Sequence, residues 1–374
     1  MKKTLVALAA LAATGAFAQS SVTIDGYFDR GYTVTNNTDN TKDSKLIGSS
    51  AGTTTIGVKV RETLKGGLSI GASFNTDFAD ASGANQDSTP TTASSIQTGG
   101  FANSQSFIDV TGGFGVVRLG MPNNFTLTNV TGVASPAFST GVGSAYSSAF
   151  SIANGIGTGT VGSVGFATQV ANGATGAGVR AIRIANTVQY SSPSFSGLTV
   201  HVGYTQKNSN GGTGTDTVGV TEGALRYTAG PVDAMLSTIK YTVGSTAPLN
   251  GSLTANSDTT QNLLGAAFTV MPGLKLHAGV GSYSSSTNVF KGSSQQFGVT
   301  YTTGAFDLMA QMASVDDKST SDIDRKMTGI GINYNLSKTA RAYVRYDNIN
   351  LNDNAAATTG SKLNRYAIGV SKSF

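Results

Sequence analysis

The chain has 374 residues, of which 12% are charged, 48 are glycine and none is cysteine, and its formal net charge is +5. Without cysteine there is no disulfide framework, and with only two histidines a His/Cys zinc site is not expected, nor is any other metal or cofactor. The small, scattered excess of basic residues excludes nucleic acid as an expected partner.

The first element along the chain has the form of an export signal. Two lysines at residues 2–3 precede an apolar run, which is shorter than the ~20 residues of a membrane-spanning helix. A small-x-small cleavage site, Ala16-Phe17-Ala18, follows the run. The expected parts are therefore a signal peptide, 1–18, cleaved between Ala18 and Gln19, and one mature domain, 19–374.

The mature chain divides into segments of about ten residues in which apolar and polar residues alternate. In residues 340–348, for example, Val344 and Tyr346 lie on one face and Arg345 and Asp347 on the other. An apolar face backed by a charged one is typical of a strand between lipid and a wet lumen. This pattern predicts an all-β protein, a transmembrane antiparallel β-barrel.

The connections between these segments alternate between tight and long, which predicts the number of strands. Seven are tight: Thr63–Gly67, Gly112–Gly113, Ser191–Gly197, Ala229–Pro231, Met271–Gly273, Thr303–Gly304 and Asn335–Thr339. Eight are long: Thr35–Thr53, Ala79–Gly100, Pro122–Ala181, Asn208–Gly219, Gly244–Thr260, Ser284–Ser294, Asp317–Asp324 and Asn352–Ser361. Fifteen connections join sixteen strands, and an even number lets the first strand pair with the last.

The third long connection, 122–181, is unusual because Leu119 to Val179 contains no Asp, Glu, Lys or Arg. An uncharged loop in a barrel with a wet lumen indicates a segment folded into the pore and packed against the wall. Two alternatives remain open. The connection is a flexible surface loop of low complexity, or Phe138 to Val170 supplies two further strands, which makes eighteen.

Several blocks of the chain resemble a known family. The mature start Ser20-Ser21-Val22-Thr23-Ile24, the run Gly112 to Gly120 and the end Tyr366 to Phe374 are similar to the Gram-negative general porins of the β-proteobacterial and neisserial type. The resemblance implies a passive, water-filled diffusion channel in the cell outer membrane, a homotrimer surrounded by lipid and lipopolysaccharide. It also implies that Phe374 is an assembly signal that the barrel assembly machinery recognises.

In such a channel the functional side chains are those that set the width and the potential of the pore. Alternation places the following candidates in the lumen near the third loop: Lys59, Arg61, Arg118, Arg183 and Asp109. Arg118 is the preferred constriction residue because it lies in mid-strand just before that loop. The alternative reading is that each is an ordinary hydrated residue or a salt bridge of the wall.

Among the residues that the alternation assigns to the lumen face, basic residues outnumber acidic ones. The basic residues are Lys59, Arg61, Arg118, Arg183, Arg226, Lys240, Lys275, Arg341, Arg345 and Arg365, and the acidic ones are Asp25, Asp29, Asp77, Asp109, Asp307 and Asp347. We therefore expect a mild preference for anions among the small hydrophilic solutes that pass. No catalytic motif is present, so no enzyme activity is expected. Two other functions stay open, a substrate-selective channel of the maltoporin kind and a surface adhesin or phage receptor.

Overall fold

The computed structural model describes residues 20–37, 42–48, 50–77, 102, 104–135, 138, 140–144, 186–206, 219–242, 258–286, 291–318, 324–351 and 362–374. The predicted signal peptide and its cleavage site at Ala18 and Gln19 lie outside these residues. So does most of the third long connection. Among the residues that the structure describes, no helix is both long and apolar enough to cross a bilayer.

The described chain is almost entirely strand, with one isolated 3-10 turn and one short helical segment. The strands are β1 (Ser20–Asn37), β2 (Lys42–Ile47), β3 (Thr55–Thr63), β4 (Ser69–Asp77), β5 (Ser106–Gly112), β6 (Gly115–Met121), β7 (Thr187–Ser191), β8 (Leu198–Thr205), β9 (Gly219–Ala229), β10 (Val232–Thr242), β11 (Asp258–Met271), β12 (Leu274–Ser285), β13 (Lys291–Thr303), β14 (Phe306–Asp317), β15 (Arg325–Asn335), β16 (Ala340–Leu351) and β17 (Lys362–Ser373). The helical elements are the 3-10 turn η1 (Lys65–Gly67), α2 (Phe125–Thr128) and the π-turns of η3 (Asn129–Ala134).

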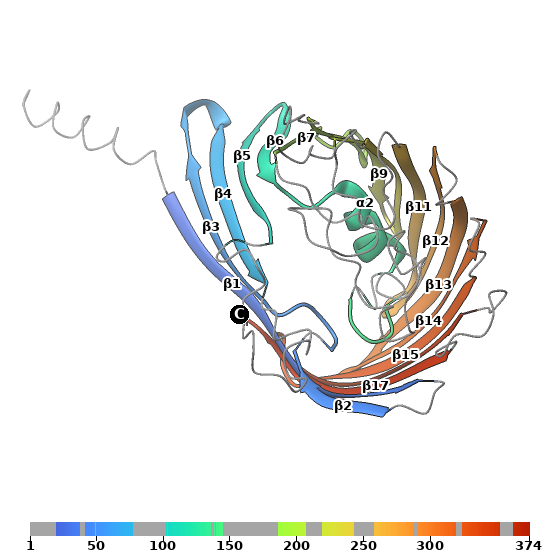
Figure 1. Cartoon of the computed structure of the whole chain (residues 1–374). Coiled ribbons are helices and arrows are strands. Elements are labelled where there is room, and N and C mark those ends of the chain that lie inside the picture. Colours follow the sequence, from blue (N-terminus) through green and yellow to red (C-terminus); the bar gives the residue numbers. More distant parts are fainter. Residues whose placement is uncertain are drawn as a thin grey trace, which may run out of the picture.

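The strands form one antiparallel ring, which confirms the predicted barrel (Figure 1). Each strand from β3 to β17 pairs with the next, and β1 closes the ring by pairing with β3 on one edge and β17 on the other. The closure joins Tyr27 to Ser373 and continues to Asn37 opposite Leu363. A closed ladder leaves no unpaired edge in lipid, which is the condition for crossing a membrane with strands.

Of the seventeen strands, sixteen form the closed ring, as predicted. The additional strand, β2, pairs only with the part of β1 that extends beyond its contact with β3, so β2 is not one of the strands of the ring. The first long connection was expected to be a loop; instead β1 runs on to Asn37 and β2 pairs back along it. The alternative of eighteen strands is wrong, because β6 pairs directly with β7 and leaves no place between them for an inserted pair.

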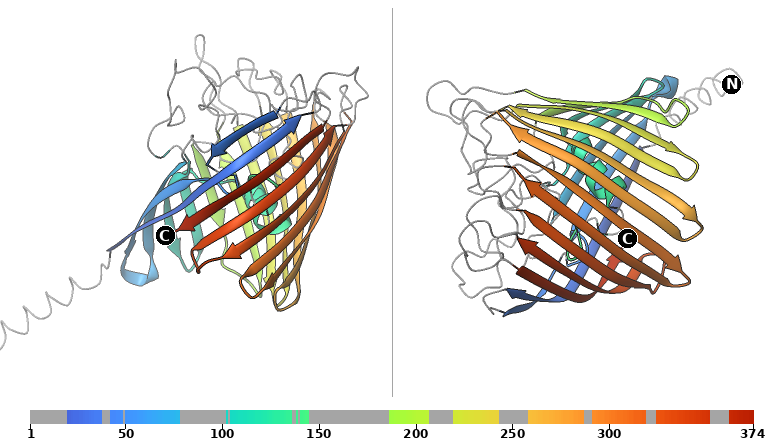
Figure 2. Two further views of the ribbon diagram at one scale, coloured as in Figure 1. Left: turned by 90° about the horizontal axis from the view of Figure 1, so that it is seen from below. Right: turned by 90° about the vertical axis from the view of Figure 1, so that its right-hand side faces the viewer.

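The seven tight connections fall at the seven predicted places and lie together at one end of the barrel (Figure 2). The strands are strongly tilted against the barrel axis in both views of that figure, as a closed sheet requires.

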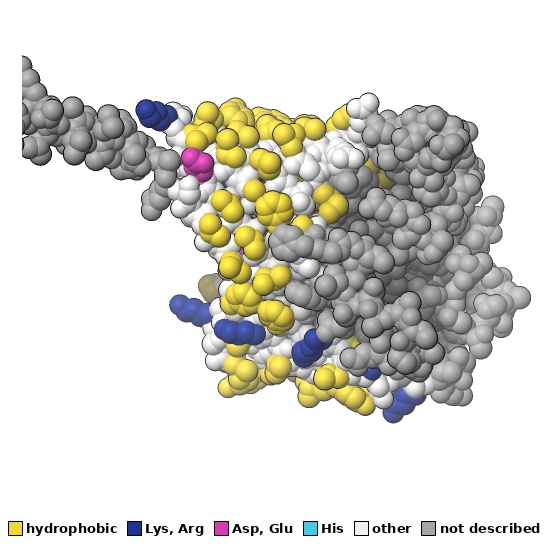
Figure 3. All heavy atoms as spheres, turned by 60° about the vertical axis from the view of Figure 1, so that its left-hand side comes forward, with side chains coloured by type: hydrophobic (Ala, Val, Ile, Leu, Met, Phe, Trp, Pro, Cys, Tyr) yellow, Lys and Arg dark blue, Asp and Glu magenta, His cyan; other side chains and the backbone are white. Residues whose placement is uncertain are grey.

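The two faces of the strands differ as the alternation predicts. Val344 is 54% exposed on the outer face, whereas its neighbours Tyr343 and Arg345 are each 2% exposed on the inner one. Figure 3 shows one side of the molecule, on which apolar side chains spread across the outer surface of the barrel. The apolar residues therefore face outward toward lipid, and the polar residues face the lumen.

Candidate functional site

The candidate site is the lumen, together with the segment of chain that enters it after β6. We call the described residues between 122 and 144 the inner segment; it contains α2 and η3. In Figure 1, α2 lies inside the ring of strands. Phe138 and Val133 of this segment are completely buried although they belong to a connection and not to the wall. The contacts below explain how the wall holds them.

At its start, the inner segment is held by β7 and β9. The side-chain amide of Gln189 donates to the carbonyl of Asn123 at 3.0 Å. The carboxylate of Glu222 accepts the backbone N–H groups of Phe125 at 2.9 Å and Thr126 at 2.5 Å. Asn124, the residue before α2, makes no side-chain cap of its own. Glu222 therefore satisfies from the wall two N–H groups that the first turn of a helix leaves open.

In its middle, the inner segment is fixed by one amide against two strands. The Nδ2 atom of Asn129 donates to the carbonyls of Met235 at 2.8 Å and Leu263 at 3.1 Å, and to Ser237 Oγ at 3.0 Å. The glycine at position 265 is required here because a Cβ atom would collide with the Oδ1 atom of Asn129. Close approach of the segment to the wall thus depends on β10 and β11 both.

Further along, the segment meets polar side chains of β12, β13 and β14. The carbonyl of Ala134 accepts from His277 Nδ1 at 2.9 Å and from the side-chain amide of Gln296. The hydroxyl of Ser135 bonds to Gln311 Oε1 at 2.8 Å. All of these groups are buried. Buried polar groups need such partners, and here the wall and the segment supply them to each other.

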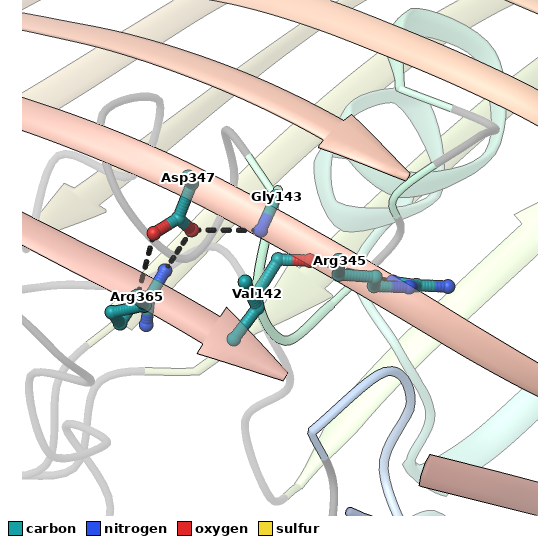
Figure 4. Close-up of polar contacts among 5 residues, drawn as sticks. All are labelled: Val142, Gly143, Arg345, Asp347 and Arg365. Carbon is teal, nitrogen blue, oxygen red and sulfur yellow. Dashed lines mark hydrogen bonds and ion pairs between the residues drawn. The ribbon is translucent and has the colours of Figure 1, made fainter. Parts of the chain in front are cut away.

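At its far end, the segment is tied to β16 and β17 by charged groups (Figure 4). Asp347 accepts the N–H of Gly143 at 2.7 Å and is held by the guanidinium of Arg365 through two hydrogen bonds, at 2.9 Å and 2.5 Å. Arg345 points away from this pair and donates to the carbonyl of Val142 at 3.5 Å. Its guanidinium carbon also lies 5.2 Å from the centre of the Phe138 ring, a cation–π distance.

A second stretch of chain, residues 50–52, meets the inner segment at the same place. The N–H of Val142 donates to the carbonyl of Ser50 at 2.8 Å, and Arg345 donates to the carbonyl of Ala51 at 3.1 Å. The carboxylate of Asp29 accepts the N–H of Ala51 at 2.6 Å and the hydroxyl of Tyr343 at 2.5 Å. Parts of two connections are therefore joined to each other and to the wall.

The predicted lumen charges on β3 are paired with acids. Lys59 forms an ion pair with Asp25. Arg61 pairs with Asp109 at 2.7 Å, and Asp109 is 6% exposed and also accepts from Thr111. The structure therefore brings Arg61 and Asp109 together, and it places the compensating acid of Lys59 on β1. Salt bridges of the wall were the alternative reading of these candidates, but the sequence did not show which acid pairs with which base.

Arg118, the preferred candidate, lies on β6 opposite Asp109 of β5 and Gln189 of β7. Its guanidinium carbon is 5.6 Å from the centre of the Phe107 ring. Within the described residues it forms no ion pair, in contrast to Lys59 and Arg61. Arg183 lies outside the described residues.

Phe374 completes the closure of the ring. Its N–H donates to the carbonyl of Gly26, and the N–H of Gly26 donates back to Phe374, both at 3.2 Å. The ring stacks on Phe28 with centroids 5.9 Å apart and is 53% exposed. The side chain of Phe374 therefore stands on the outer face of the barrel.

Toward the end with the tight turns the lumen is open. A cavity of about 430 Å³ lies there, and the charged and amide side chains that line it are Lys275, Asp307, Asn333 and Arg341. Asp307 accepts from Thr302 at 2.9 Å and from Asn333 at 3.3 Å. Arg341 donates to hydroxyl groups of Tyr27 and Ser371 and, within the described chain, to no acid.

The sequence reasoning missed the residues that hold the inner segment, Glu222 above all. Alternation contains the signal for it. Leu225 and Tyr227 are exposed on the outer face of β9, so Glu222 belongs to the lumen face together with Arg226. Nothing in the sequence shows that its partner is a backbone segment 96 residues away.

Comparison with known proteins gives a consistent set of relatives. The model of the Gram-negative porin family matches residues 4–354. The chain is 29% identical to outer membrane porin protein 32 of Delftia acidovorans over 364 residues, which covers 92% of this chain and 88% of that protein. In fold it is similar to the anion-selective porin from Comamonas acidovorans, with a TM-score of 0.73, 22% identity and coverage of 95% and 100% of the two chains. It is also similar to the trimer form of OmpT from Vibrio cholerae, with a TM-score of 0.63, 15% identity and coverage of 95% and 99%.

Proposed function

Because this chain belongs to the Gram-negative porin family and is an outer-membrane diffusion channel, we propose that its pore favours anions over cations among small hydrophilic solutes. Passage of solutes through such a lumen requires no covalent chemistry. A barrel of sixteen strands is wide enough to leave an aqueous channel.

The observation that carries this proposal is the unequal pairing of lumen charges. The acids are engaged: Asp25 with Lys59, Asp109 with Arg61, and Asp347 with Arg365. Arg118 and Arg341 form no ion pair among the described residues; Asp109, opposite Arg118 in the sheet, pairs with Arg61. A paired charge is nearly cancelled at a distance, whereas an unpaired one acts over a Debye length of ~10 Å at about 0.1 M salt. These two arginines would therefore make the potential around them positive.

Two lumen acids are also withdrawn from solvent. Asp29 and Glu222 are 1% and 4% exposed, and both accept backbone N–H groups. Asp307 is the remaining acid of the open cavity, where Lys275 and Arg341 outnumber it. A structural relative is described as an anion-selective porin, which agrees with the proposed preference.

We further propose that the chain is exported by residues 1–18, inserted by the barrel assembly machinery with Phe374 as its signal, and assembled as a homotrimer in lipid and lipopolysaccharide. The exposed ring of Phe374 at the strand end is accessible to a recognition partner. The trimer is supported by the apolar outer face (Figure 3) and by the trimeric form of one structural relative.

The test is a reversal potential measured on the purified protein in planar bilayers under a potassium chloride gradient. We expect chloride to be favoured, and the preference to weaken as the salt concentration rises. Cation selectivity at low salt would contradict the proposed charge balance. Liposome swelling with a size series of sugars should show rates that fall smoothly with solute size; saturation by one solute would instead identify a substrate-selective channel.

A further inference from the structure

We propose, on the premise that the barrel conducts as proposed above, that Glu222 is the positioning residue for the start of the inner segment, and that protonation of its carboxyl group releases that end into the lumen. The width of the pore would then depend on pH through one side chain. The inference starts from a difference between the two carboxylates that hold the two ends of the inner segment.

At the far end, Asp347 binds the N–H of Gly143 and is also held by Arg365. At the near end, Glu222 binds the N–H groups of Phe125 and Thr126 and forms no ion pair within the described chain. The negative charge of Asp347 is therefore compensated by a cation, whereas that of Glu222 is met by neutral donors and by no ion pair within the described chain. Acid should act on the near end first.

Protonation changes what Glu222 can accept. As a carboxylate it offers one oxygen to each of the two N–H groups, Oε2 to Phe125 and Oε1 to Thr126. A protonated carboxyl group carries a hydroxyl donor on one of these oxygens, so one N–H loses its acceptor. A buried backbone N–H without an acceptor destabilises the structure around it. The near end of the segment is thereby weakened while the far end stays tied.

The surroundings of Glu222 contain few other groups that titrate. The inner segment contributes none, since residues 119–179 contain no Asp, Glu, Lys, Arg or His. Gly203 of β8 and Ile239 of β10 lie directly opposite Glu222 in the sheet. The titratable and charged groups on the lumen faces of the neighbouring strands are Arg118 of β6, His201 of β8, Arg226 of β9, and Asp233 and Tyr241 of β10.

Of these groups, His201 is the one whose protonation could also explain a release of the inner segment at low pH. Its ring centroid lies 4.6 Å from that of Phe125, and its Nδ1 atom bonds to Ser191 Oγ at 2.8 Å. Protonation of His201 would also disturb the start of the inner segment. Arg226 and Asp233 neutralise each other through two hydrogen bonds, at 2.9 Å and 2.8 Å. The experiment must therefore separate Glu222 from His201.

The experiment reports the motion of the inner segment directly. Because the chain has no cysteine, Gly132→Cys provides a unique site for a nitroxide label, and a Cβ atom there would meet nothing within 4 Å. Label mobility is followed from about pH 8 to about pH 4, a range that brackets the ordinary pKa values of glutamate and histidine. A label at Val344→Cys, on the outer face, serves as the control for loosening of the whole barrel.

We expect the label at position 132 to become more mobile on acidification while the label at position 344 does not. In Glu222→Gln the label at 132 should be mobile at every pH, because an amide offers one acceptor oxygen and a donor in place of two acceptors. Glu222→Asp, which keeps the carboxylate, and His201→Gln should both retain the pH response. The single-channel conductance of the wild-type chain at low pH should match that of Glu222→Gln at all pH values.

A wild-type pH response in Glu222→Gln, or its loss in His201→Gln, would overturn the inference. If Glu222→Gln does not assemble, the His201→Gln and Glu222→Asp arms still decide between the two side chains. A label that responds in a barrel that never conducts would support the role of Glu222 and overturn the proposed function instead. Normal conductance with a label insensitive to pH would support the proposed function and overturn the role of Glu222.

Discussion

Replacing Arg118 by glutamate should move the ion selectivity of the pore toward cations by an amount that follows from simple electrostatics. A unit charge about 7 Å from a passing ion contributes about 0.6 kcal/mol in water, and screening at about 0.1 M salt halves this value. Arg118→Glu changes two unit charges, and the effects on chloride and potassium have opposite signs. The ratio of their permeabilities should therefore shift by about 1.2 kcal/mol, or about sevenfold.

This shift in selectivity should also depend on the salt concentration. At about 1 M salt the Debye length is ~3 Å and the shift should fall to about 1.5-fold. The assay is the reversal potential across a planar bilayer at two salt levels. The matched control is the double variant Lys59→Gln with Asp25→Asn, which removes an ion pair without changing net charge and should leave selectivity almost unchanged. An unchanged reversal potential in Arg118→Glu, or a large shift in the control, would refute this charge assignment.

Three other predictions follow from the described contacts. Asp347→Asn removes the charge of a carboxylate that is fully buried and pairs with Arg365, and breaking a buried pair costs up to about 3–5 kcal/mol; the folded band in unheated SDS gels should melt at a lower temperature, and an unchanged melting temperature would argue against this pair as a support of the barrel. Deleting Phe374 removes its hydrogen bonds to Gly26 and its stacking on Phe28, so assembled barrel should fall sharply while Phe374→Tyr assembles normally; normal outer-membrane levels of the deletion would show that the signal lies elsewhere. Unheated samples should run as SDS-resistant trimers that heat dissociates, and monomers both in gels and by light scattering in mild detergent would contradict the homotrimer.

The barrel could be predicted from the sequence because its signal is local. Alternation with period two is visible within a single strand, and a tight turn is visible in a few residues of glycine or proline. The outward orientation of Ile330 and Ile332, which are both about half exposed, can be predicted without knowledge of the rest of the chain. Sixteen strands then follow from counting connections. What alternation cannot show is which residue faces which across the sheet or the lumen.

The details of the site depend on such distant contacts. Lys59 and Asp25 lie 34 residues apart and Arg61 and Asp109 lie 48 residues apart, so their pairing emerges only when the ring closes. Arg345 counted in the sequence as a lumen charge, yet it is 2% exposed and ties two connections together. Lys240 was also counted as a lumen charge, but this prediction is wrong: its neighbours Ile239 and Tyr241 are buried on the inner face of β10, and Lys240 lies on the outer face in an ion pair with Asp258. A tally of charges by parity therefore overstates the number that a passing ion meets.

The direct pairing of β6 with β7 has a consequence for how this scaffold can change. Because β6 pairs directly with β7, the ladder closes the ring without the described residues of the inner segment. A different segment could be grafted between Met121 and Thr187 without altering a single inter-strand pairing. Only the anchoring side chains of the wall, such as Glu222, would have to change with it. The barrel and the inner segment are thus separable parts of the structure. Exchanging the inner segment would change the permeation properties and leave the barrel unchanged.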